Sequence, residues 1–450
     1  MPRVFFLALY FLSPALPLWL FYASAQGPLA RTAMIPAVAA GTLAFVWLCW
    51  QLILVARLKF VERFCGQDAL IRFHVVMGAA ALGLGGIHAG LIDEQTGSGL
   101  QGGLGNVGIY VLLVMMIISA LLLTDFLVRF FMPLKKARDM VLKLARLDYR
   151  VLLWGHSVLL LGIAMLLGHV MLVPGEGLLR FKAAMAAYFG LGVLALAYRV
   201  VYRRWRLAKR PWVVAAVRAE PGDVHTVELA PSKGRCFAHK PGQFLYFRPL
   251  ESKLRSEEHP FTIASAPDRE RGVAISVKGL GDFTRSLAKL RPGDKVAVDG
   301  PYGRFSHHHS PGEGELVFLA GGIGVTPFLS MLGSLEAESF ARPARLIWGA
   351  RRQGDLFRLR QLSDMAARHP GFSFHPVLSR DKEWPGLTGR VNCELLEILL
   401  AKRHACLVDD AGREREFFVC AAPSAMNALI RALKSLSVPK QRIHAERFSF

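Results

Sequence analysis

The stretch His74–His88, "HVVMGAAALGLGGIH", decides the fold of the first half of the chain. It is almost wholly apolar, it has a histidine at each end, and glycine and alanine fill its centre. A second stretch, His156–His169, "HSVLLLGIAMLLGH", repeats this arrangement. Polar side chains at the depth of a membrane are costly and usually functional. The two stretches therefore predict a membrane domain with a functional site between two of its helices.

Six apolar runs in the first 205 residues are each long enough to cross the hydrocarbon core of a membrane, which takes about 20 residues. They lie at 4–23, 32–56, 70–92, 107–131, 150–173 and 181–202. The first run also resembles a signal peptide, but it is long for one, so we expect a retained helix. Lysine and arginine cluster after the second, fourth and sixth runs, whereas 93–106 contains neither. Because positive charge stays inside, we expect an integral protein of the plasma (inner) membrane whose N-terminus and second half are cytoplasmic.

The formal net charge of the chain is +21, from 55 basic and 34 acidic side chains. Such a charge can indicate nucleic-acid binding, but much of the excess lies in membrane-proximal connections, where anionic lipid explains it. We therefore expect a lipid membrane and no nucleic acid as partner. The six cysteines form no C-x-x-C pair, which argues against an iron–sulfur or zinc cluster. We interpret "HHHS" at 307–310 as a solvated loop and not as a metal site.

The four histidines of the opening stretches fall into two pairs. The third and fifth runs cross the membrane in the same direction. His74 then faces His156 near the cytoplasmic side (the inner pair), and His88 faces His169 near the outer side (the outer pair). Each pair offers two axial imidazoles to one haem iron, and fourteen residues at about 1.5 Å each separate two b-type haems by about 21 Å. The alternative is four separate histidines that hydrogen-bond across helices.

The spacing of the histidines predicts an irregular fifth helix. A separation of fourteen residues returns to within about 40° of the same helix face, but a separation of thirteen misses it by about 140°. We expect a local distortion near Gly162 or Gly168, or haems that approach from different directions. Room for a porphyrin on the third helix is expected beside Gly78, Gly83, Gly85 and Gly86.

The second half of the chain predicts two further domains. Short alternating strands from about 211 to 310 predict a small antiparallel β-barrel. From 315 an apolar strand runs into a glycine turn and a helix, "ELVFLAGGIGVTPFLSML", and later buried strands end in small or polar residues. This pattern predicts a parallel α/β sheet with a ligand edge at the carboxyl ends of its strands. The fold class is thus a multi-domain membrane protein with a six-helix transmembrane bundle (1–205), a β-barrel domain (206–312) and an α/β nucleotide-binding domain (313–450).

Seven motifs carry a resemblance that covers nearly the whole chain. In order they are "PGQF", "HPFTIAS", "GDFT", "GPYG", "AGGIGVTP", "CAAP" and the terminal "ERFSF". This order resembles the ferredoxin–NADP reductase type of flavin module. Joined to six helices with paired histidines, the chain is similar to the NADPH oxidase and ferric reductase superfamily. The resemblance implies an NAD(P)H-dependent oxidoreductase with FAD, two haem b groups and NADPH, with NADH as the alternative and no obligatory protein partner.

The resemblance also implies roles for the residues that match these motifs. Phe261 and Thr262 would line the isoalloxazine ring, with the Thr262 hydroxyl near its reactive nitrogen. Further FAD contacts would come from Gln243, His259, Pro260, Ser265, Lys278, Gly281, Asp282 and Thr284. The dinucleotide would be cradled by Gly321, Gly322, Gly324, Thr326 and Pro327. Cys420 would lie near the nicotinamide, and either Phe448 or Phe450 would cover the flavin.

Two groups of residues are expected to bind the phosphates of these nucleotides. In "GLGDFTRSL" (279–287), a glycine turn before a short helix offers free backbone N–H groups to a pyrophosphate, with Lys278 as counter-charge. The residues that follow the second and third strands of the predicted parallel sheet are Arg351, Arg352, Ser379 and Arg380. A bidentate arginine suits a 2′-phosphate, which favours NADPH over NADH. The alternative is that these arginines are solvated loop charges.

The resemblance implies that electrons pass from cytoplasmic NADPH through FAD and the two haems to an acceptor on the outer face. Arg31, at the start of the second helix, resembles an arginine that oxidases place beside the outer haem, where positive charge would stabilise forming superoxide. Ile92 stands where some oxidases have a further histidine, which is a departure from the oxidase pattern. O2, reduced to superoxide, is the favoured acceptor. The alternatives are a ferric chelate or another metal, and a dedicated protein outside the membrane.

Overall fold

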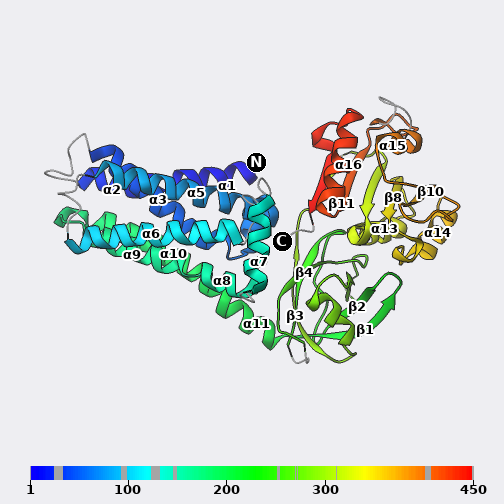
Figure 1. Ribbon diagram of the computed structural model, residues 1–450, viewed down its shortest axis with the longest axis horizontal. Coiled ribbons are helices and arrows are strands. Elements are labelled where there is room, and N and C mark those ends of the chain that lie inside the picture. The colour runs from blue at the N-terminus through cyan, green and yellow to red at the C-terminus, as the bar shows by residue number, and fades with distance from the viewer. Residues whose placement is uncertain are drawn as a thin grey trace. The chain divides into compact units, whose positions relative to one another are not determined.

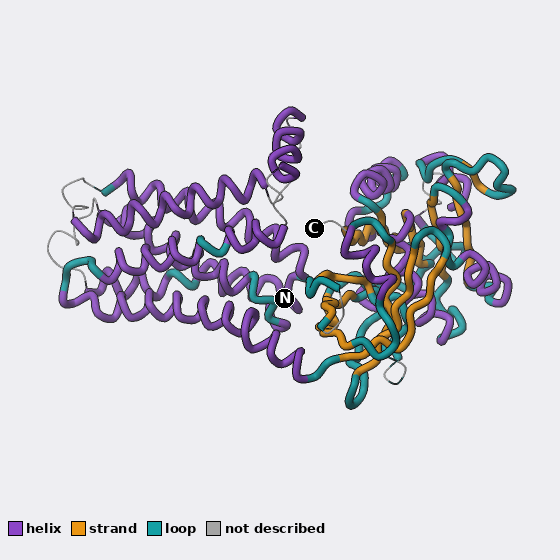
Figure 2. Tube along the Cα trace, turned by 60° about the horizontal axis from the view of Figure 1, so that its bottom comes forward, coloured by secondary structure: helices purple, strands orange, loops and turns teal. Residues whose placement is uncertain are grey.

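The computed structural model describes residues 2–24, 34–92, 99–122, 132–144, 149–250, 254–268, 270, 272–310, 312–400 and 407–447. The chain divides into two compact units, Met1–Arg203 and Arg204–Phe450. The first unit is helical, and the second contains two six-stranded sheets (Figure 1). All strands in Figure 2 therefore belong to the second unit.

Among the described residues, six helical segments are long and apolar enough to cross a membrane, as the six apolar runs predict. The helices that build them are α1 (Pro2–Leu12), α2 (Ala15–Ser24), α3 (Ile35–Leu54), α5 (Gln67–Leu91), α6 (Gly99–Leu122), α8 (Tyr149–His156), α9 (Leu159–Met171), α10 (Leu179–Ala197), the π-helical η5 (Tyr198–Arg203) and α11 (Arg204–Lys209). Two shorter helices, α4 (Lys59–Cys65) and α7 (Met132–Leu144), lie in the connections.

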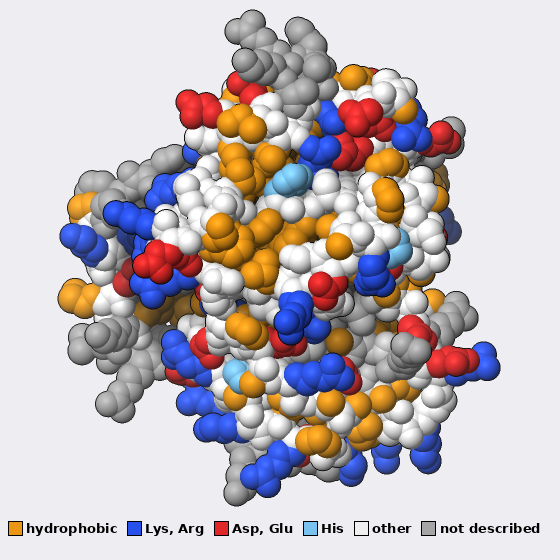
Figure 3. Space-filling view, turned by 90° about the vertical axis from the view of Figure 1, so that its right-hand side faces the viewer, with side chains coloured by type: hydrophobic (Ala, Val, Ile, Leu, Met, Phe, Trp, Pro, Cys, Tyr) orange, Lys and Arg blue, Asp and Glu red, His pale blue; other side chains and the backbone are white. Residues whose placement is uncertain are grey.

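The exterior of the helical unit is strongly apolar. Val4, Trp154 and Leu194 expose 70%, 73% and 67% of their surface, and many other large hydrophobic side chains of this unit are exposed as well. In the second unit, by contrast, acidic and basic side chains are interspersed over the face that Figure 3 shows. Extended apolar surface on a folded unit marks contact with another apolar phase or partner, and hydrocarbon suits the helical unit.

Helix α6 begins at Gly99, well before the predicted run of 107–131, and residues 123–131 lie outside the described part of the chain. Two glycines, Gly108 on α6 and Gly162 on α9, allow these helices to approach closely. A Cβ on Gly108 would lie 3.2 Å from the backbone oxygen of Gly162, and a Cβ on Gly162 would lie 2.8 Å from Leu112 Cγ. Small residues are common where membrane helices pack, and this contact outweighs the low helix propensity of glycine.

The fifth membrane segment is interrupted, as the spacing of its histidines predicts. Helix α8 ends at His156 and α9 begins at Leu159. Between them, the N–H groups of 157–158 each bond to the oxygen three residues back, at 3.0 Å. Such a turn rotates about 120° per residue instead of about 100°, which changes the angle between the two histidines. The distortion follows directly after His156, and not at Gly162 or Gly168.

The second unit begins with an antiparallel sheet in the order β4-β3-β6-β1-β2-β5. Its strands are β1 (Trp212–Glu220), β2 (Val224–Pro231), β3 (Phe244–Pro249), β4 (His259–Thr262), β5 (Val273–Lys278) and β6 (Lys295–Tyr302). The predicted barrel is not closed: between the edge strands β4 and β5 there is one isolated bridge, Ile263↔Ile275, because β4 has only four residues. The segment interpreted as a solvated loop forms the 3-10 helix η7 (His307–His309), in which His307 is buried.

The second sheet is parallel throughout, in the order β10-β9-β8-β7-β11-β12. Its strands are β7 (Leu316–Gly321), β8 (Ala344–Ala350), β9 (Phe372–Leu378), β10 (Leu387–Thr388), β11 (Glu416–Ala421) and β12 (Ile443–Arg447). Side chains of α13 (Thr326–Ala337) and α14 (Leu359–Arg368) join the core on one face, and those of α15 (Cys393–Leu400) and α16 (Pro423–Ser435) join the core on the other. The predicted parallel α/β domain is confirmed, with apolar strands covered on both faces.

Candidate functional site

The structure brings the four membrane histidines together as two facing pairs. The rings of His74 on α5 and His156 at the end of α8 have centroids 6.3 Å apart and planes at 63°. The rings of His88 on α5 and His169 on α9 have centroids 6.0 Å apart and planes at 82°. The two pairs lie at opposite ends of the same bundle, because both use α5 and each uses one part of the interrupted fifth segment.

Both rings of the outer pair are anchored on backbone carbonyls of neighbouring helices. His88 Nδ1 lies 2.8 Å from Ala37 O on α3, and His169 Nδ1 lies 2.9 Å from Gln101 O on α6. A carbonyl oxygen only accepts, so each Nδ1 carries the proton and donates it. The other ring nitrogen, Nε2, is then left with its lone pair. This is the tautomer that a metal-binding histidine uses when a second group orients it.

Two glycines make these anchors possible, and the sequence reasoning missed both. A Cβ on Gly41 would lie 2.7 Å from His88 Nδ1, and a Cβ on Gly105 would lie 2.8 Å from His169 Nδ1. Each glycine stands four residues after the carbonyl that accepts the bond, Ala37 or Gln101, and so lies on the same helix face. A side chain there would push the imidazole off its acceptor. Nothing in the local sequence reveals this, because the contact joins separate helices.

Three of the four glycines that the sequence singled out lie beside space that protein atoms do not fill. A Cβ on Gly78, Gly83 or Gly86 would meet nothing within 4 Å, whereas one on Gly85 would meet Ile109 at 2.8 Å. Three of the four positions are therefore consistent with room for a bulky planar group along α5.

The inner pair is held differently. Ser119 Oγ lies 2.9 Å from His156 Nδ1. His74 Nδ1 is buried and has no hydrogen-bond partner among the described residues. A hydroxyl is a more adaptable partner than a backbone carbonyl, because it both donates and accepts. The two pairs therefore differ in how firmly the protein fixes their tautomers.

In the antiparallel sheet, the predicted flavin residues gather on and around β4. Thr262 is 5% exposed, and its Oγ1 is buried with no hydrogen-bond partner among the described residues. The ring of His259 stacks on Phe283 with centroids 4.0 Å apart, and Phe283 also stacks on Phe261. Pro260 pairs with Tyr246 of β3. Buried polar atoms are normally satisfied, so the Thr262 hydroxyl is an exception among the described residues.

Other residues predicted to contact FAD are engaged in holding the loops around this sheet. Gln243 Nε2 donates to Gly303 O at 3.0 Å. Ser265 Oγ accepts from Ala274 N at 3.0 Å, and Ser265 O accepts from the Ser330 hydroxyl at 2.6 Å. Gln243 and Ser265 therefore fix the backbone near β4, and Ser265 also links this sheet to α13 of the parallel domain.

The glycine turn before α12 (Asp282–Ser286) is more satisfied than expected. Thr284 Oγ1 accepts hydrogen bonds from the N–H groups of Leu280 and Gly281, at 3.0 and 2.9 Å. These two N–H groups are thus not free for a pyrophosphate in this structure. The carboxylate of Asp282 is fully exposed. Thr284 therefore orders the turn, and the N–H of Gly279 donates to Asp223 O at 2.9 Å.

Lys278 joins the two sheets and is not a free counter-charge. Its Nζ lies 2.7 Å from Asp355 Oδ1, and both side chains are largely buried. Burial raises the pKa of the Asp355 carboxyl, but the hydrogen bond and charge of Lys278 outweigh it and hold that pKa below its usual value. A second ion pair, between Arg358 and Glu220 at 3.1 Å, links α14 to β1. The antiparallel and parallel domains are therefore tied by two ion pairs.

The glycine turn after β7 lies at the carboxyl edge of the parallel sheet, as predicted. Gly322 has a φ of +55°, which favours glycine, and its missing side chain leaves open space. A Cβ on Gly321 would lie 2.7 Å from Ala421 Cβ, and one on Gly324 would clash with the backbone of Cys420. Thr326 Oγ1 donates to Ile323 O at 3.1 Å. Pro327 stands in the first turn of α13.

Cys420, predicted to lie near the nicotinamide, is fully buried at the end of β11. Its side chain belongs to the hydrophobic core that includes Phe318 and Phe418. Burial, with the nearby charge of Glu446, raises the pKa of the Cys420 thiol. The thiol is therefore neutral and has no exposed surface through which a nicotinamide would touch it in this conformation.

The residues predicted to bind the 2′-phosphate lie side by side at two adjacent strand ends. Ser379 N donates to Ala350 O at 3.0 Å, and Arg380 N donates to Arg351 O at 2.9 Å. The residues of this exposed edge are Arg351, Arg352, Ser379 and Arg380. The remaining predicted site residues, Arg31, Phe448 and Phe450, lie outside the described residues.

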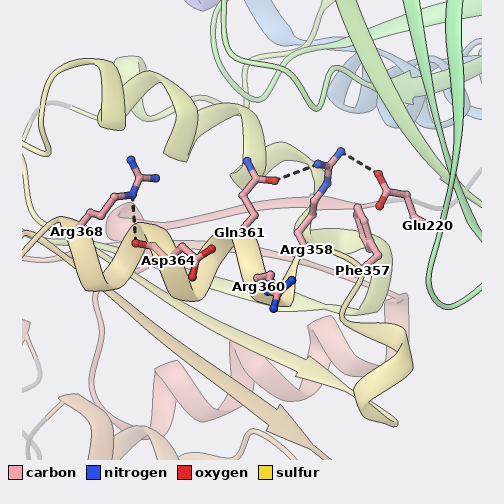
Figure 4. Close-up of a pocket in the computed structure, with 7 residues that line it drawn as sticks. All are labelled: Glu220, Phe357, Arg358, Arg360, Gln361, Asp364 and Arg368. Carbon is pink, nitrogen blue, oxygen red and sulfur yellow. Dashed lines mark hydrogen bonds and ion pairs between the residues drawn. The ribbon is translucent and has the colours of Figure 1, made fainter.

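A hollow of about 410 Å³ lies beside α14, and none of the residues predicted to bind a cofactor lines it (Figure 4). It is lined by Glu220, Phe357, Arg358, Arg360, Gln361, Asp364 and Arg368. Figure 4 shows Arg358 directed toward Gln361 and Glu220, which it contacts at 3.0 and 3.1 Å.

Residues 211–306 match the FAD-binding domain family, and residues 318–431 match the oxidoreductase NAD-binding domain family. The reductase component of phenol 2-monooxygenase from Pseudomonas sp. (strain CF600) is 32% identical over 194 residues, 42% of this chain and 52% of that protein. One subunit of the Na(+)-translocating NADH-quinone reductase of Neisseria meningitidis is 30% identical over 203 residues, 42% of this chain and 48% of that protein. The reductase component of propane 2-monooxygenase from Mycolicibacterium goodii is 29% identical over 244 residues, 52% of this chain and 66% of that protein.

Solved structures are also similar over part of the chain. A cytochrome P450 reductase from Amycolatopsis is 24% identical with a TM-score of 0.46, and the match covers 53% of this chain and 69% of that one. The FAD/NAD-binding domain of a nitric oxide dioxygenase from Vibrio cholerae is 23% identical with a TM-score of 0.45, covering 53% and 98%. The chain spans between about half and two thirds of the length of the curated relatives described above. Its second unit is an NAD(P)H-dependent oxidoreductase module composed of an FAD-binding and an NAD-binding domain.

Proposed function

We propose that this chain carries electrons from cytoplasmic NADPH across the plasma (inner) membrane to O2 on the outer face, which yields superoxide. The observation that carries the proposal is the arrangement of the four histidines as two facing pairs at opposite ends of one apolar bundle. A module that binds FAD and a nicotinamide nucleotide follows in the same chain. Such a combination is what transfer from a nicotinamide donor to the far side of a membrane requires.

The geometry of the histidine pairs fits haem iron. Two imidazoles on opposite sides of a metal, each bonded at about 2.0 Å and with a ring radius of about 1.1 Å, have centroids about 6.2 Å apart. The observed separations are 6.3 and 6.0 Å. In the described parts of the chain no group of three or more His, Cys, Asp or Glu side chains could hold a metal ion. Two imidazoles alone suit a macrocycle that supplies the other ligands of the iron.

The hydrogen bonds of the histidines support the same role. The Nδ1 atoms of His88 and His169 are bonded to carbonyls, which leaves each Nε2 with its lone pair, and the centroids of the two rings lie 6.0 Å apart. A histidine that only stabilised helix packing would need a single hydrogen-bond partner. Each of these rings has a hydrogen-bond partner at Nδ1 and also lies next to a second imidazole. Second groups of this kind orient metal-binding histidines and raise their basicity.

When bound, FAD exchanges two electrons with the nicotinamide and single electrons with haem iron, and the haems carry single electrons. The residues of the chain bind and orient these groups. Thr262 offers an unpartnered buried hydroxyl to the flavin, and the open space at Gly322 admits a nucleotide close to the backbone. Arg351 and Arg380, on adjacent strand ends, offer their guanidinium groups to the 2′-phosphate. NADPH is therefore proposed as the donor, in preference to NADH.

A second candidate function is transfer to a partner protein. The curated relatives are named as reductase components or as a subunit of a reductase, which describes parts of larger systems. If the chain worked in this way, its acceptor would be a protein and O2 would be a poor substitute. The comparison with O2 is therefore part of the test.

The test is NADPH consumption by the purified full-length protein, loaded with FAD and haem, in air and without oxygen. Turnover that requires oxygen and yields dismutase-sensitive superoxide supports the proposal. Turnover without oxygen only after a ferric chelate is added identifies a metal reductase instead. Turnover that appears only with a partner protein supports the second candidate. Oxidised and reduced spectra without haem bands would remove the proposed role of all four histidines.

A further inference from the structure

Helix α7 combines an exposed apolar side with an exposed basic side. Its sequence is "MPLKKARDMVLKL", and it follows α6 directly in the order of helices. Met140 and Val141 expose 64% and 46% of their surface, and Ala137 lies three and four residues before them on the same side. Lys135 and Lys136 are also exposed, and neither has an ion-pair partner among the described residues.

This helix lies at the end of the bundle that holds the inner pair. Helix α6 runs from Gln101, which binds the outer pair, to Ser119, which binds the inner pair, and α7 follows. Figure 1 shows α7 running at a steep angle to the long helices of the bundle. With the bundle across a membrane, α7 would lie in the plane of its surface. Its thirteen residues give a length of about 20 Å at about 1.5 Å per residue.

The exposed apolar side of α7 is unfavourable in water, and its exposed lysines are unfavourable in a protein core. In a core, Met140 and Val141 would be covered, and in water their exposure would be unfavourable. A helix with one apolar and one strongly basic side is typical of the boundary between headgroups and acyl chains. Of its charged residues, Arg138 pairs with Asp139 at 3.0 Å, which leaves the lysines to attract an anionic surface.

We propose that α7 lies in the cytoplasmic leaflet and binds anionic phospholipid headgroups through Lys135 and Lys136, with Met140 and Val141 inserted among the acyl chains. The inference rests on the proposal that the bundle spans a membrane. Charge complementarity selects this occupant, because the helix carries four basic residues and one acidic residue and the cytoplasmic leaflet is negative. The surface would hold the end of the bundle near the inner pair at a fixed depth.

The test is amide hydrogen exchange of α7 in the full-length protein, in nanodiscs of phosphatidylcholine alone and with phosphatidylglycerol added. We expect slower exchange in the anionic nanodiscs. Each lysine near an anionic surface contributes about fivefold in affinity, so Lys135→Gln with Lys136→Gln should reduce the added protection by up to about 25-fold. The pair Lys135→Arg with Lys136→Arg should keep it. Lys434→Gln, an exposed lysine of the second unit, removes one charge elsewhere and should change nothing.

Other outcomes would overturn the inference in distinguishable ways. Equal protection of α7 in neutral and anionic nanodiscs, unaffected by the glutamine variants, would mean that headgroup charge is not recognised. Equal protection in detergent without lipid would mean that lipid headgroups are not what orders α7. Rapid exchange throughout α5 in nanodiscs would refute the membrane-spanning bundle itself, and with it both proposals. Protected α5 with unprotected α7 would overturn only the lipid contact.

Discussion

Replacement of Gly105 by alanine tests how the outer pair is anchored. A Cβ at this position would lie 2.8 Å from His169 Nδ1, whereas ordinary contact begins at 3.4 Å. The ring must therefore retreat by about 0.6 Å, which would stretch its 2.9 Å hydrogen bond to Gln101 O to about 3.5 Å, where a hydrogen bond is effectively lost. Loss of such a bond to a metal-binding histidine lowers metal affinity about 10- to 100-fold, or about 1.4 to 2.8 kcal/mol.

The measurement is the haem content of the purified protein and the redox titration of its haem absorbance. Gly103→Ala is the matched control, because Gly103 is two residues away on α6 and its Cβ would meet nothing within 4 Å. Both variants gain the same helix propensity, so their difference isolates the steric effect on His169. We expect Gly105→Ala to weaken or lose one of two haems and Gly103→Ala to keep both. Equal haem content and equal potentials in the two variants would refute the reasoning.

Three further predictions concern the inner pair and the second unit. Ser119→Ala should shift the midpoint potential of one haem component by less than about 59 mV, the equivalent of a tenfold change for one electron. A redox titration measures this shift, and a shift in both haem components would contradict a local effect. Asp355→Asn should lower the free energy of unfolding by about 1 kcal/mol at neutral pH. The folded-state pKa of Asp355 is lowered, so the contribution of its ion pair with Lys278 is present above the unfolded pKa and is lost as pH falls through the folded pKa. The free energies of unfolding of the wild type and the variant, measured in urea, should therefore converge between neutral and acid pH. A difference that stays constant with pH would argue against the ion pair. Arg351→Ala with Arg380→Ala should raise KM for NADPH about 10- to 100-fold and leave KM for NADH unchanged, and equal effects on both nucleotides in steady-state kinetics would exclude a 2′-phosphate site.

Features that depend on composition along one segment were predictable from the sequence. The six spans follow from the length of apolar runs, and the interruption of the fifth follows from the separation of thirteen positions from His156 to His169. The position of the interruption did not follow, because glycine was taken as the weak point and the turn instead begins directly after His156. The early start of α6 at Gly99 did not follow either, because its first residues are rich in glycine, which has a low helix propensity.

Features that depend on contacts between segments were not predictable. Gly41 and Gly105 act on histidines more than forty residues away in sequence, and no motif links them. A motif match likewise does not reveal contacts between domains or within a turn: Lys278 pairs with Asp355 of the other domain, and Thr284 accepts from the N–H groups of its own turn.

The anchors of the two pairs also predict an order of reduction potentials. Both rings of the outer pair donate from Nδ1 to backbone carbonyls. In the inner pair His156 meets a hydroxyl, and His74 Nδ1 has no partner among the described residues. A strong acceptor at Nδ1 makes an imidazole more basic and stabilises the oxidised iron. The outer haem should therefore have the lower midpoint potential.

A redox titration of the loaded protein yields the two midpoints, and the variants assign them, because Gly105→Ala should act on the outer component and Ser119→Ala on the inner one. A lower potential at the outer pair opposes transfer toward it but favours donation of an electron to the final acceptor. The driving force for electron transfer from the inner to the outer haem would thus be smaller, and the outer haem would be a stronger reductant. If the component shifted by Gly105→Ala were the one of higher potential, the hydrogen bonds at Nδ1 would not be what sets the order.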